Sequence, residues 1–303
     1  MRIGIDLGGT KIAAVALKED GTQLADFHAL VPRSYAGTRD LLLKAVSDLE
    51  ATANQTADAV GLSMPGAITA AGEVLRAVNL PWMVQQPLKT DLAGHLDRPV
   101  GVANDANCFA LSEAYDGAAA GADVVFGVIL GTGVGGGLVV NGHALAGANA
   151  IAGEWGHNPL PWRKRGDGPT ARCGCGRKGC IESWLNGGAL ARDHAHLSGD
   201  NLDAPAVVKR AAAGGAYAQH AMERYHDRLA RALASIVNLI DPDVIVLGGG
   251  LSGISSLYDK VPPLMNNYTQ VAAPATRLVQ ARHGPTSGMR GAARIVPTSL
   301  ATE

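Results

Sequence analysis

The sequence has almost no excess of charge of either sign. Its 303 residues include 26 Lys and Arg against 27 Asp and Glu, which gives a formal net charge of −1. Proteins that bind nucleic acid usually carry a strongly basic surface, so this balance gives no sign of a nucleic-acid partner. Hydrophobic residues make up 47% and charged residues 17%, which is typical of a folded globular protein rather than a disordered one.

The sequence also lacks a segment suited to a membrane. Residues 124–153 contain no Asp, Glu, Lys or Arg, but GTGVGGG and NGH interrupt this stretch before 18 apolar residues accumulate. The N-terminus, MRIGIDLGGTK, begins as a strand and shows none of the regions of a signal peptide. We therefore expect a cytoplasmic protein with no membrane partner.

Cysteine is scarce, and its distribution is uneven. Three of the four cysteines lie within eight residues, in the run CGCGRKGCIE. They are Cys173, Cys175 and Cys180. With His157 from GEWGHNPL, they make a Cys₃His set that suits a structural zinc ion. The alternative is a group of buried or redox-active thiols, but nothing indicates an oxidising compartment, and the clustering favours metal. The loop is flanked by Glu154 and Glu182, two carboxylates that such a loop could hold in place for chemistry.

Glycine, in contrast, is abundant and gathers where predicted strands end. The 39 glycines concentrate in GGT, GTGVGGG and LGGGLSG. Glycine at such points permits tight turns and a close approach of the backbone to a ligand. The apolar pattern predicts strands at 3–7, 12–17, 59–66, 99–107, within 124–142 on both sides of GTGVGGG, and at 243–252. It predicts helices at 38–53 with Thr38 as the N-cap, at about 106–118, and at about 216–240. The last helix places Met222, Tyr225, Leu229, Leu233, Ile236 and Leu239 on one apolar face.

Two parts of the chain follow the same plan. GIDLGGTKIAAVAL and GVILGTGVGGGLVV each read as an apolar strand, a glycine and threonine turn, and a second apolar strand. An Asn-Gly pair at 141–142 adds a hairpin signal after the second copy. We infer an internal duplication and two α/β domains with a cleft between them.

The two glycine turns are better suited to phosphate than to a dinucleotide. GTGVGG at 131–136 matches the dinucleotide pattern, but a strand-like segment follows it where that pattern needs a helix. Both turns offer backbone N–H groups and a hydroxyl, from Thr10 and Thr132, that can cradle phosphate oxygens. Ordinary hairpins are the alternative for one such turn, whereas two similar turns favour nucleotide binding. Asp6 is placed to hold a hydrated Mg²⁺, or is a strand residue that caps the turn, and Lys11 either pairs with phosphate or is solvated.

A candidate general base follows the strand at 99–107. Asp105 in NDAN stands at the end of that strand, where ligands bind in open α/β sheets. A carboxylate there can take the proton of a hydroxyl that attacks phosphorus. The alternative is a helix N-cap, which spacing alone would favour. The glycine turns and the cysteine cluster together favour the base.

Taken together, these residues resemble the ROK family of sugar kinases, in the actin-like ATPase superfamily of hexokinase-type enzymes. The resemblance covers DLGGTK, NDANCFALSEA, GTGVGGG, GEWGHNPL, CGCGRKGCIE, DPDVIVLGGGLS and HGPTSGMRGAA, which is nearly the whole chain. It implies two actin-like, ribonuclease H-like α/β domains with an interdomain cleft and duplicated β-hairpin phosphate motifs. We place the N-terminal domain at 1–116, completed by 288–303, and the C-terminal domain with the zinc loop at 117–287.

The resemblance also assigns roles to individual residues. Residues that resemble the ATP and phosphate motifs are Asp6, Gly8, Gly9, Thr10, Lys11, Thr132, Gly133, Gly248, Gly249 and Gly250. Residues expected to contact the sugar are Gly66, Asn79, Asn104, Asp105, Glu154, His157 and Glu182. Asp105 matches the catalytic base, and His157 with the three cysteines matches the zinc set. His157 can serve both metal and sugar, because a ligating imidazole keeps its other ring nitrogen free to donate.

We therefore expect an enzyme that uses ATP and Mg²⁺ to phosphorylate the 6-hydroxyl of a hexose, with zinc as a structural ion. GEWGHNPLPW resembles the fructokinase branch most closely, so fructose is the expected substrate. NDANCFALSEA and ARHGPTSGMRGAA also resemble N-acetylglucosamine kinases, and glucokinase or mannokinase activity is a further alternative. Alternatives of other classes are a sugar-sensing regulator that transfers no phosphate and a nicotinamide oxidoreductase. The resemblance suggests a homodimer.

Overall fold

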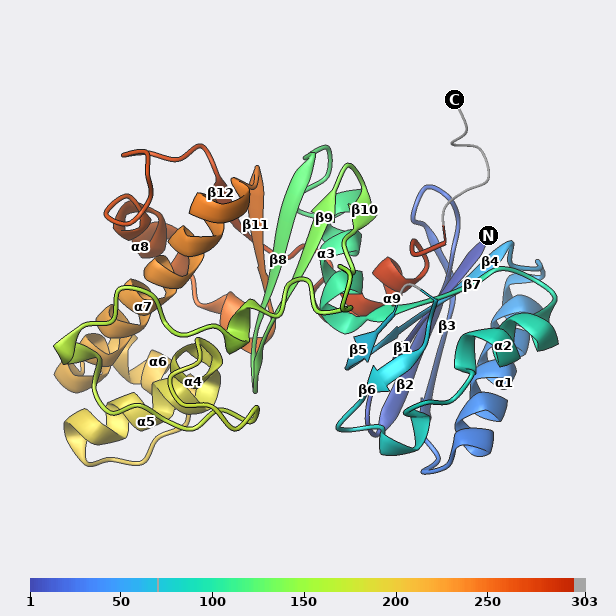
Figure 1. The fold of residues 1–303 in the computed structure, drawn as a ribbon, viewed down its shortest axis with the longest axis horizontal. Coiled ribbons are helices and arrows are strands. Elements are labelled where there is room, and N and C mark those ends of the chain that lie inside the picture. Colours follow the sequence, from blue (N-terminus) through green and yellow to red (C-terminus); the bar gives the residue numbers. More distant parts are fainter. Residues whose placement is uncertain (70, 297–303) are drawn as a thin grey trace. The chain divides into compact units, whose positions relative to one another are not determined.

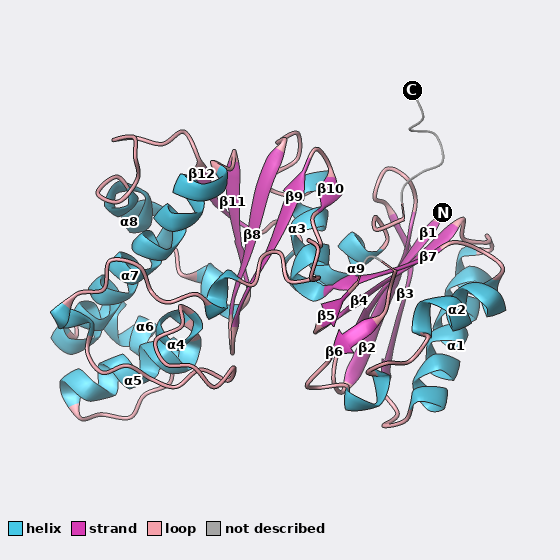
Figure 2. Cartoon of the chain, viewed as in Figure 1, coloured by secondary structure: helices cyan, strands magenta, loops and turns pink. Residues whose placement is uncertain are grey.

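The structure is a computed structural model that describes residues 1–69 and 71–296. The chain divides into two compact units. The first contains residues 1–123, 137–153 and those from 282 onward, and the second contains 124–136 and 154–281. Both units combine helices and strands, so the predicted α/β class is confirmed (Figures 1 and 2). The predicted domain boundaries remain a proposal, and residues 297–303 of the first predicted domain lie outside the described part.

The first unit is built on a five-stranded sheet of order β3-β2-β1-β4-β7. Its strands are β1 (Arg2–Leu7), β2 (Lys11–Leu17), β3 (Gln23–Leu30), β4 (Ala59–Met64) and β7 (Val100–Asn104). The first three strands are antiparallel neighbours, whereas β4 runs parallel to both β1 and β7. The carboxyl ends of β1, β4 and β7 therefore lie at the same end of the sheet. A separate two-stranded sheet is formed by β5 (Ala67–Ile68) and β6 (Val74–Arg76).

Helices cover both faces of this sheet (Figure 1). They are α1 (Tyr35–Ala53), α2 (Leu88–Leu96), α3 (Asp105–Tyr115) and α9 (Ser287–Ala292), with short 3₁₀ turns at Pro81–Met83 and Gly284–Thr286. The apolar side of α1, which includes Leu42, Val46 and Leu49, is buried in the same core as the Ile3 and Ile5 side chains of β1.

The predicted start of the first helix is wrong. The helix begins at Tyr35, and its N-cap is Ser34, whose hydroxyl accepts a hydrogen bond from the Gly37 backbone N–H. Thr38 lies inside the helix and is fully buried, and its hydroxyl accepts from the Trp82 indole at 3.0 Å. A threonine before an apolar run looks like a cap in sequence, but here its hydroxyl serves a tertiary contact.

The opposite face of the sheet is covered by α9, which comes from the far end of the chain. This helix approaches the strands so closely that side chains could not stand between them. A Cβ atom at Gly61 would lie 1.7 Å from the Ala292 carbonyl oxygen, and one at Gly4 would lie 1.9 Å from that of Met289. Glycine in β1 and β4 is therefore what allows the backbone contact with α9.

A second five-stranded sheet has the order β10-β9-β8-β11-β12. Its strands are β8 (Val124–Leu130), β9 (Val134–Val140), β10 (His143–Ala144), β11 (Val244–Gly248) and β12 (Arg277–Gln280). As in the first sheet, an antiparallel pair stands at one edge, here β10 with β9, and the other side is parallel, with β11 parallel to both β8 and β12. This agreement confirms the predicted duplication. The Asn-Gly signal is also confirmed, because Asn141 (φ 48°) and Gly142 (φ 75°) form the turn between β9 and β10.

The remaining helices belong to the second unit. They are α4 (Glu182–Leu185), α5 (Gly187–Ser198), α6 (Ala204–Ala212), α7 (Ala216–Ile240) and α8 (Ser256–Met265), with 3₁₀ turns at Trp155–His157, Arg165–Asp167 and Gly250–Gly253. The predicted long helix is confirmed as α7, and Asp241 ends it in the left-handed conformation with φ 43°. Its predicted apolar face is buried from Met222 to Ile236, but Leu239 is 79% exposed, so that position of the face is wrong.

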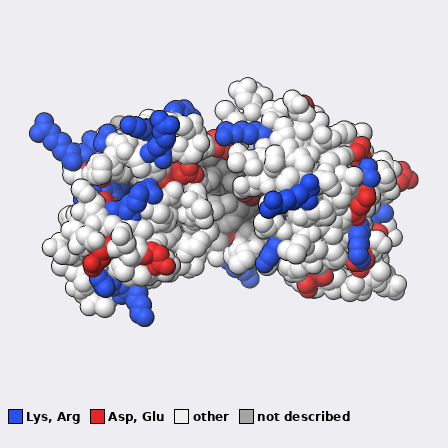
Figure 3. Space-filling model, turned by 90° about the horizontal axis from the view of Figure 1, so that it is seen from below, with Lys and Arg blue, Asp and Glu red and all other residues white. Residues whose placement is uncertain are grey.

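Within the described residues, no helix is long and apolar enough to cross a membrane. On the face shown in Figure 3, basic and acidic side chains are interspersed on both units. This distribution agrees with the small net charge of the chain.

Candidate functional site

In the first unit, polar side chains meet at the carboxyl ends of β1, β4 and β7. Asp6 of β1 lies opposite Ser63 of β4, and the Ser63 hydroxyl donates to Asp6 Oδ1 at 2.8 Å. Burial raises the pKa of Asp6; the Ser63 hydrogen bond opposes this rise, and the nearby charge of Asp105 adds to it. Carboxylates grouped in this way suit Mg²⁺, which prefers oxygen ligands and keeps several waters. The residues thus fit the predicted magnesium site.

Asn104 and Asp105 stand at the junction between β7 and α3. Asn104 is the N-cap of α3: its Oδ1 accepts from the Ala106 N–H at 2.8 Å, and its Nδ2 donates to the Gly66 carbonyl at 2.9 Å. Asp105 is the first residue of the helix, and its Oδ1 also accepts from Ala106 N–H, at 2.9 Å. Burial raises the pKa of the Asp105 carboxyl. A carboxylate with a raised pKa takes up a proton more readily near neutral pH, as a general base must.

The first glycine turn, residues 8–11, joins β1 to β2. It is closed by a hydrogen bond of 3.0 Å from Gly8 N–H to the Lys11 carbonyl, and Thr10 and Lys11 are exposed. Asn79 lies against this turn, because a Cβ atom at Gly9 would come within 2.9 Å of Asn79 Cβ. Asn79, predicted as a sugar contact, is therefore beside the predicted phosphate turn.

The second glycine turn lies between β8 and β9. Gly131 N–H donates to the Gly133 carbonyl at 3.0 Å, so Thr132 stands at the tip. The strand β11 runs parallel to β8 with Gly248 opposite Ile129, and Gly249 (φ 80°) follows directly. The residues predicted to bind phosphate, Thr132 and Gly133, and those predicted to bind adenosine, Gly248 to Gly250, thus lie at the same end of these two strands. A strand and not a helix follows GTGVGG, so the dinucleotide pattern lacks its required context.

The predicted metal ligands come together in the second unit. The ligand atoms of His157, Cys173, Cys175 and Cys180 all lie within 4.8 Å of one another. His157 Nδ1 is 3.4 Å from Cys173 Sγ, and Cys175 Sγ is 3.7 Å from Cys180 Sγ. Tetrahedral zinc with Zn–S near 2.3 Å and Zn–N near 2.0 Å places such ligand atoms about 3.5–3.8 Å apart. The four side chains therefore fit a structural zinc ion.

The two ring nitrogens of His157 face different groups. Nδ1 points to the cysteines, whereas Nε2 lies 3.5 Å from Glu154 Oε2. This is the arrangement that a ligating histidine with an oriented second nitrogen requires. Between the two residues, Trp155 is buried; its indole N–H donates to the Gly135 carbonyl at 3.0 Å, and its ring meets Phe126 edge to face. Trp155 thus fixes the segment that carries Glu154 and His157.

Glu182 connects the cysteine loop to the second glycine turn. It opens the short helix α4, and its Oε1 lies 3.2 Å from Cys173 Sγ. Its Oε2 accepts from the Val134 backbone N–H at 3.1 Å, directly after the turn that contains Thr132. The loop and the turn are therefore linked through one carboxylate.

The sequence matches one known protein family along nearly its whole length. The model of the ROK family matches residues 2–299. The chain belongs to the ROK family. It is similar to the N-acetyl-D-glucosamine kinases of Salmonella heidelberg (strain SL476) and of Salmonella choleraesuis (strain SC-B67), each 41% identical over 300 residues, or 97% of this chain and 98% of the relative.

Solved structures of ROK proteins share the fold. The ROK hexokinase of Thermus thermophilus superposes with a TM-score of 0.85 at 32% identity and covers 97% of both chains. The ROK family glucokinase of Streptomyces griseus, in complex with glucose and AMPPNP, gives a TM-score of 0.75 at 30% identity over 97% of this chain and 98% of its own. The resemblance to the ROK family and the actin-like fold predicted from the sequence are therefore confirmed.

The sequence did not predict the buried ion pairs that join α7 to Asp167 and Asp193 in this ROK chain. Arg231 of α7 is fully buried and pairs with Asp167 through both oxygens, one of them at 2.9 Å. Arg228, one turn before, binds both oxygens of Asp193 at 3.0 and 3.1 Å. Burial alone would raise the pKa of Asp167, but the Arg231 hydrogen bond and the other bonds to this carboxylate lower it. The only signal in the sequence is a pair of arginines on the otherwise apolar side of a helix.

Proposed function

We propose that this protein transfers the γ-phosphoryl group of ATP to the 6-hydroxyl of N-acetyl-D-glucosamine. The observation that carries the proposal is the 41% identity, over 97% of the chain, to N-acetyl-D-glucosamine kinases. The coarser statement, that the chain is a sugar kinase of the ROK family, is supported by the same relatives and by the hexokinase and glucokinase structures. The expectation of fructose finds no support among these relatives, and the alternative substrate replaces it. The predicted homodimer also stays a proposal.

The roles of individual residues follow from the chemistry of the reaction. Asp105 takes the proton of the attacking hydroxyl, and the raised pKa of its carboxyl suits that task. Asp6 would hold a hydrated Mg²⁺, which supplies positive charge next to the phosphate groups. The two glycine turns donate backbone N–H groups to the phosphate oxygens. The adenosine is bound by Gly248, Gly249 and Gly250.

The residues proposed to contact the sugar are those predicted from the sequence: Gly66, Asn79, Asn104, Asp105, Glu154, His157 and Glu182. Phosphoryl transfer needs little covalent work from a protein, so the main contribution of these residues is to position the hydroxyl and exclude water. A zinc ion held by His157 and the three cysteines has no open coordination position, and its role is to fix the loop.

A coupled assay of ADP release with a panel of sugars tests the proposal. We expect kcat/KM for N-acetyl-D-glucosamine to exceed that for fructose, glucose and mannose by at least about tenfold, or about 1.4 kcal/mol of transition-state binding. Asp105→Asn should lower kcat by about 10²–10⁴-fold, the usual contribution of a general base. Asp97→Asn is the matched control, because Asp97 is exposed and its left-handed backbone suits Asn equally well.

Three outcomes would contradict the proposal. A preference for fructose would restore the substrate first expected from the sequence. Sugar binding without ADP release would favour the regulator. Near wild-type turnover of the Asp105→Asn variant would exclude Asp105 as the base.

A further inference from the structure

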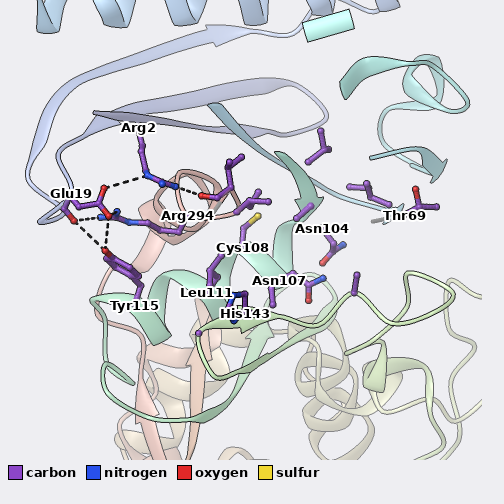
Figure 4. Close-up of a pocket in the computed structure, with 18 residues that line it drawn as sticks. Arg2, Glu19, Thr69, Asn104, Asn107, Cys108, Leu111, Tyr115, His143 and Arg294 are labelled. Carbon is purple, nitrogen blue, oxygen red and sulfur yellow. Dashed lines mark hydrogen bonds and ion pairs between the residues drawn. The ribbon is translucent and has the colours of Figure 1, made fainter. Parts of the chain in front are cut away.

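The first unit contains a cavity of about 360 Å³ that the proposed reaction does not use. Its walls come from the edge strand β7, one side of α3, the β10 hairpin and the residues that follow α9. Figure 4 shows the 18 residues that line it. Small-molecule sites in proteins usually have volumes of about 300–1,000 Å³, so the size suits a metabolite. Among the residues assigned above to sugar, nucleotide or metal, only Asn104 lines the cavity, and its amide already bonds to Gly66 and Ala106.

One end of the cavity is lined by two arginines. The buried guanidinium groups of Arg2 and Arg294 meet there, and both form an ion pair with Glu19 (Figure 4). Glu19 lies 3.5 Å from Arg2 Nε and 3.4 Å from Arg294 Nη1, and its side chain is 61% exposed. Of the three charged residues that line this end, two are cations and one is an anion, and Asp20 and Asp58 lie near enough to interact with Arg294 and Arg2. Arginine in such a setting binds phosphate or carboxylate groups.

The Arg294 side chain is held in place but not fully hydrogen-bonded. Its guanidinium lies 3.9 Å from the centre of the Tyr115 ring, and Nη2 donates to the Glu19 backbone carbonyl at 2.8 Å. Nη1 is buried and makes no hydrogen bond to any described residue, since the contact with Glu19 is an ion pair only. A fixed arginine with an unused buried N–H group is suited to an acceptor from outside the protein.

The other end of the cavity offers an unused acceptor. Asn107, in the first turn of α3, is only 8% exposed, and its Oδ1 atom is buried without a hydrogen-bond partner among residues 1–69 and 71–296. Such groups are rare in folded proteins because an unpaired buried oxygen is costly. In Figure 4, Asn107 lies with Asn104 and Thr69 at one end and the arginines lie at the other, with Cys108 between them.

We propose that this cavity binds a small organic anion. Its phosphate or carboxylate group pairs with Arg294 and Arg2, its body lies along the apolar walls near Cys108 and Leu111, and a hydroxyl or amide N–H donates to Asn107 Oδ1. A phosphorylated sugar and a hydroxycarboxylic acid both have this chemistry. The proposal does not depend on the reaction proposed above, because binding is measured without phosphate transfer.

Isothermal titration with four probes tests the site. The probes are N-acetyl-D-glucosamine 6-phosphate, glycerol 3-phosphate, citrate and inorganic phosphate. At least one organic anion should bind with a Kd below about 1 mM, and inorganic phosphate should bind more weakly because it has no body to reach Asn107. Arg294→Met and Asn107→Leu should each weaken that binding by at least about tenfold. Arg33→Met is the matched control, since Arg33 is an exposed arginine of the same unit that does not line the cavity.

Thermal unfolding keeps the test decisive if a variant folds poorly. Asn107→Leu should raise the Tm in the absence of ligand, because it removes an unpaired buried oxygen. The proposal is wrong if no organic anion binds at about 10 mM, or if both cavity variants bind like the wild type. It is also wrong if Asn107→Leu lowers the Tm while Arg33→Met does not.

Discussion

At the scale of single residues, the end of the first sheet brings together two carboxyl groups that do not favour ionisation. Burial raises the pKa of both Asp6 and Asp105, and the charge of Asp105 adds to the effect on Asp6. A group that resists ionisation costs folding free energy wherever solution pH would ionise it. The sequence identified both residues from their positions at strand ends. It could not identify Ser63, which bonds to Asp6, since a serine in an apolar strand gives no sign of the strand beside it.

The raised pKa of Asp105 predicts a pH-dependent gain in stability for Asp105→Asn. A carboxyl whose folded-state pKa lies above its unfolded-state pKa binds more protons in the folded state. Its contribution to the free energy of unfolding therefore becomes less favourable as pH rises through both pKa values. We expect the free energy of unfolding of the variant to exceed that of the wild type by about 0.5–2 kcal/mol at about pH 8. This difference should disappear near about pH 4. Unfolding by denaturant at several pH values measures this. An Asp105→Asn protein that is less stable at pH 8, with Asp97→Asn unchanged, would contradict the prediction.

At the scale of elements, local sequence patterns predicted whether a segment forms a helix or a strand. They predicted less well which residues pack against that segment. Residues 216–240 were predicted as a helix and form α7, because a long apolar stripe at helical spacing has few alternatives. The same stripe wrongly included Leu239, since periodicity does not show where the packing partner ends. Thr38 failed as a cap for a similar reason: its hydroxyl bonds to Trp82, which is 44 residues away in sequence. Contacts between distant segments decided both cases.

The cysteine loop is the element whose position was best predicted from sequence. Three sulfurs with intervening glycines can converge only in a loop, and the structure brings them within reach of His157. Glu182 adds a connection that spacing could not reveal, because its carboxylate lies 3.2 Å from Cys173 Sγ and accepts from the backbone N–H beside the second glycine turn. A disturbance of the loop should therefore reach the predicted phosphate turn as well as the predicted sugar residues.

Removal of the metal tests this connection. We expect about one zinc per chain by elemental analysis, and loss of that zinc in Cys175→Ser. The loss should lower the Tm by more than about 5 °C and raise the KM for both sugar and ATP. Cys108→Ala is the matched control, since Cys108 is buried in the other unit and should leave the zinc content unchanged. A wild-type protein that holds no zinc after purification without chelators, or a zinc-free variant with normal stability, would refute the assignment.

At the scale of the whole molecule, the first unit depends on a segment that returns from the end of the chain. Glu113 of α3 is fully buried, and its carboxylate accepts from the backbone N–H groups of Arg282 and His283 at 2.9 and 3.0 Å. The Ser287 hydroxyl donates to the same carboxylate at 3.0 Å. A glutamate in the apolar run NDANCFALSEA is unusual, but nothing in the sequence shows that its partners lie about 170 residues away. The resemblance suggested that the C-terminal segment completes the first domain, whereas the contacts that hold it there required the structure.

The return of this segment predicts that residues 1–123 alone will not fold. Without α9, the backbone at Gly4 and Gly61 loses its cover, and the small apolar cluster of Val15 and Leu17 loses Met289 and Ala293. Glu113 would then keep the Ala118 N–H but lose its donors from Arg282, His283 and Ser287, and a buried carboxylate with so few donors costs free energy. We expect the 1–123 fragment to show no cooperative unfolding transition by circular dichroism. Addition of a peptide of residues 282–296 should restore ordered structure, whereas the same peptide with Ser287→Leu and Met289→Asp should not. A fragment that unfolds cooperatively without the peptide would show that the first unit does not need the returning segment.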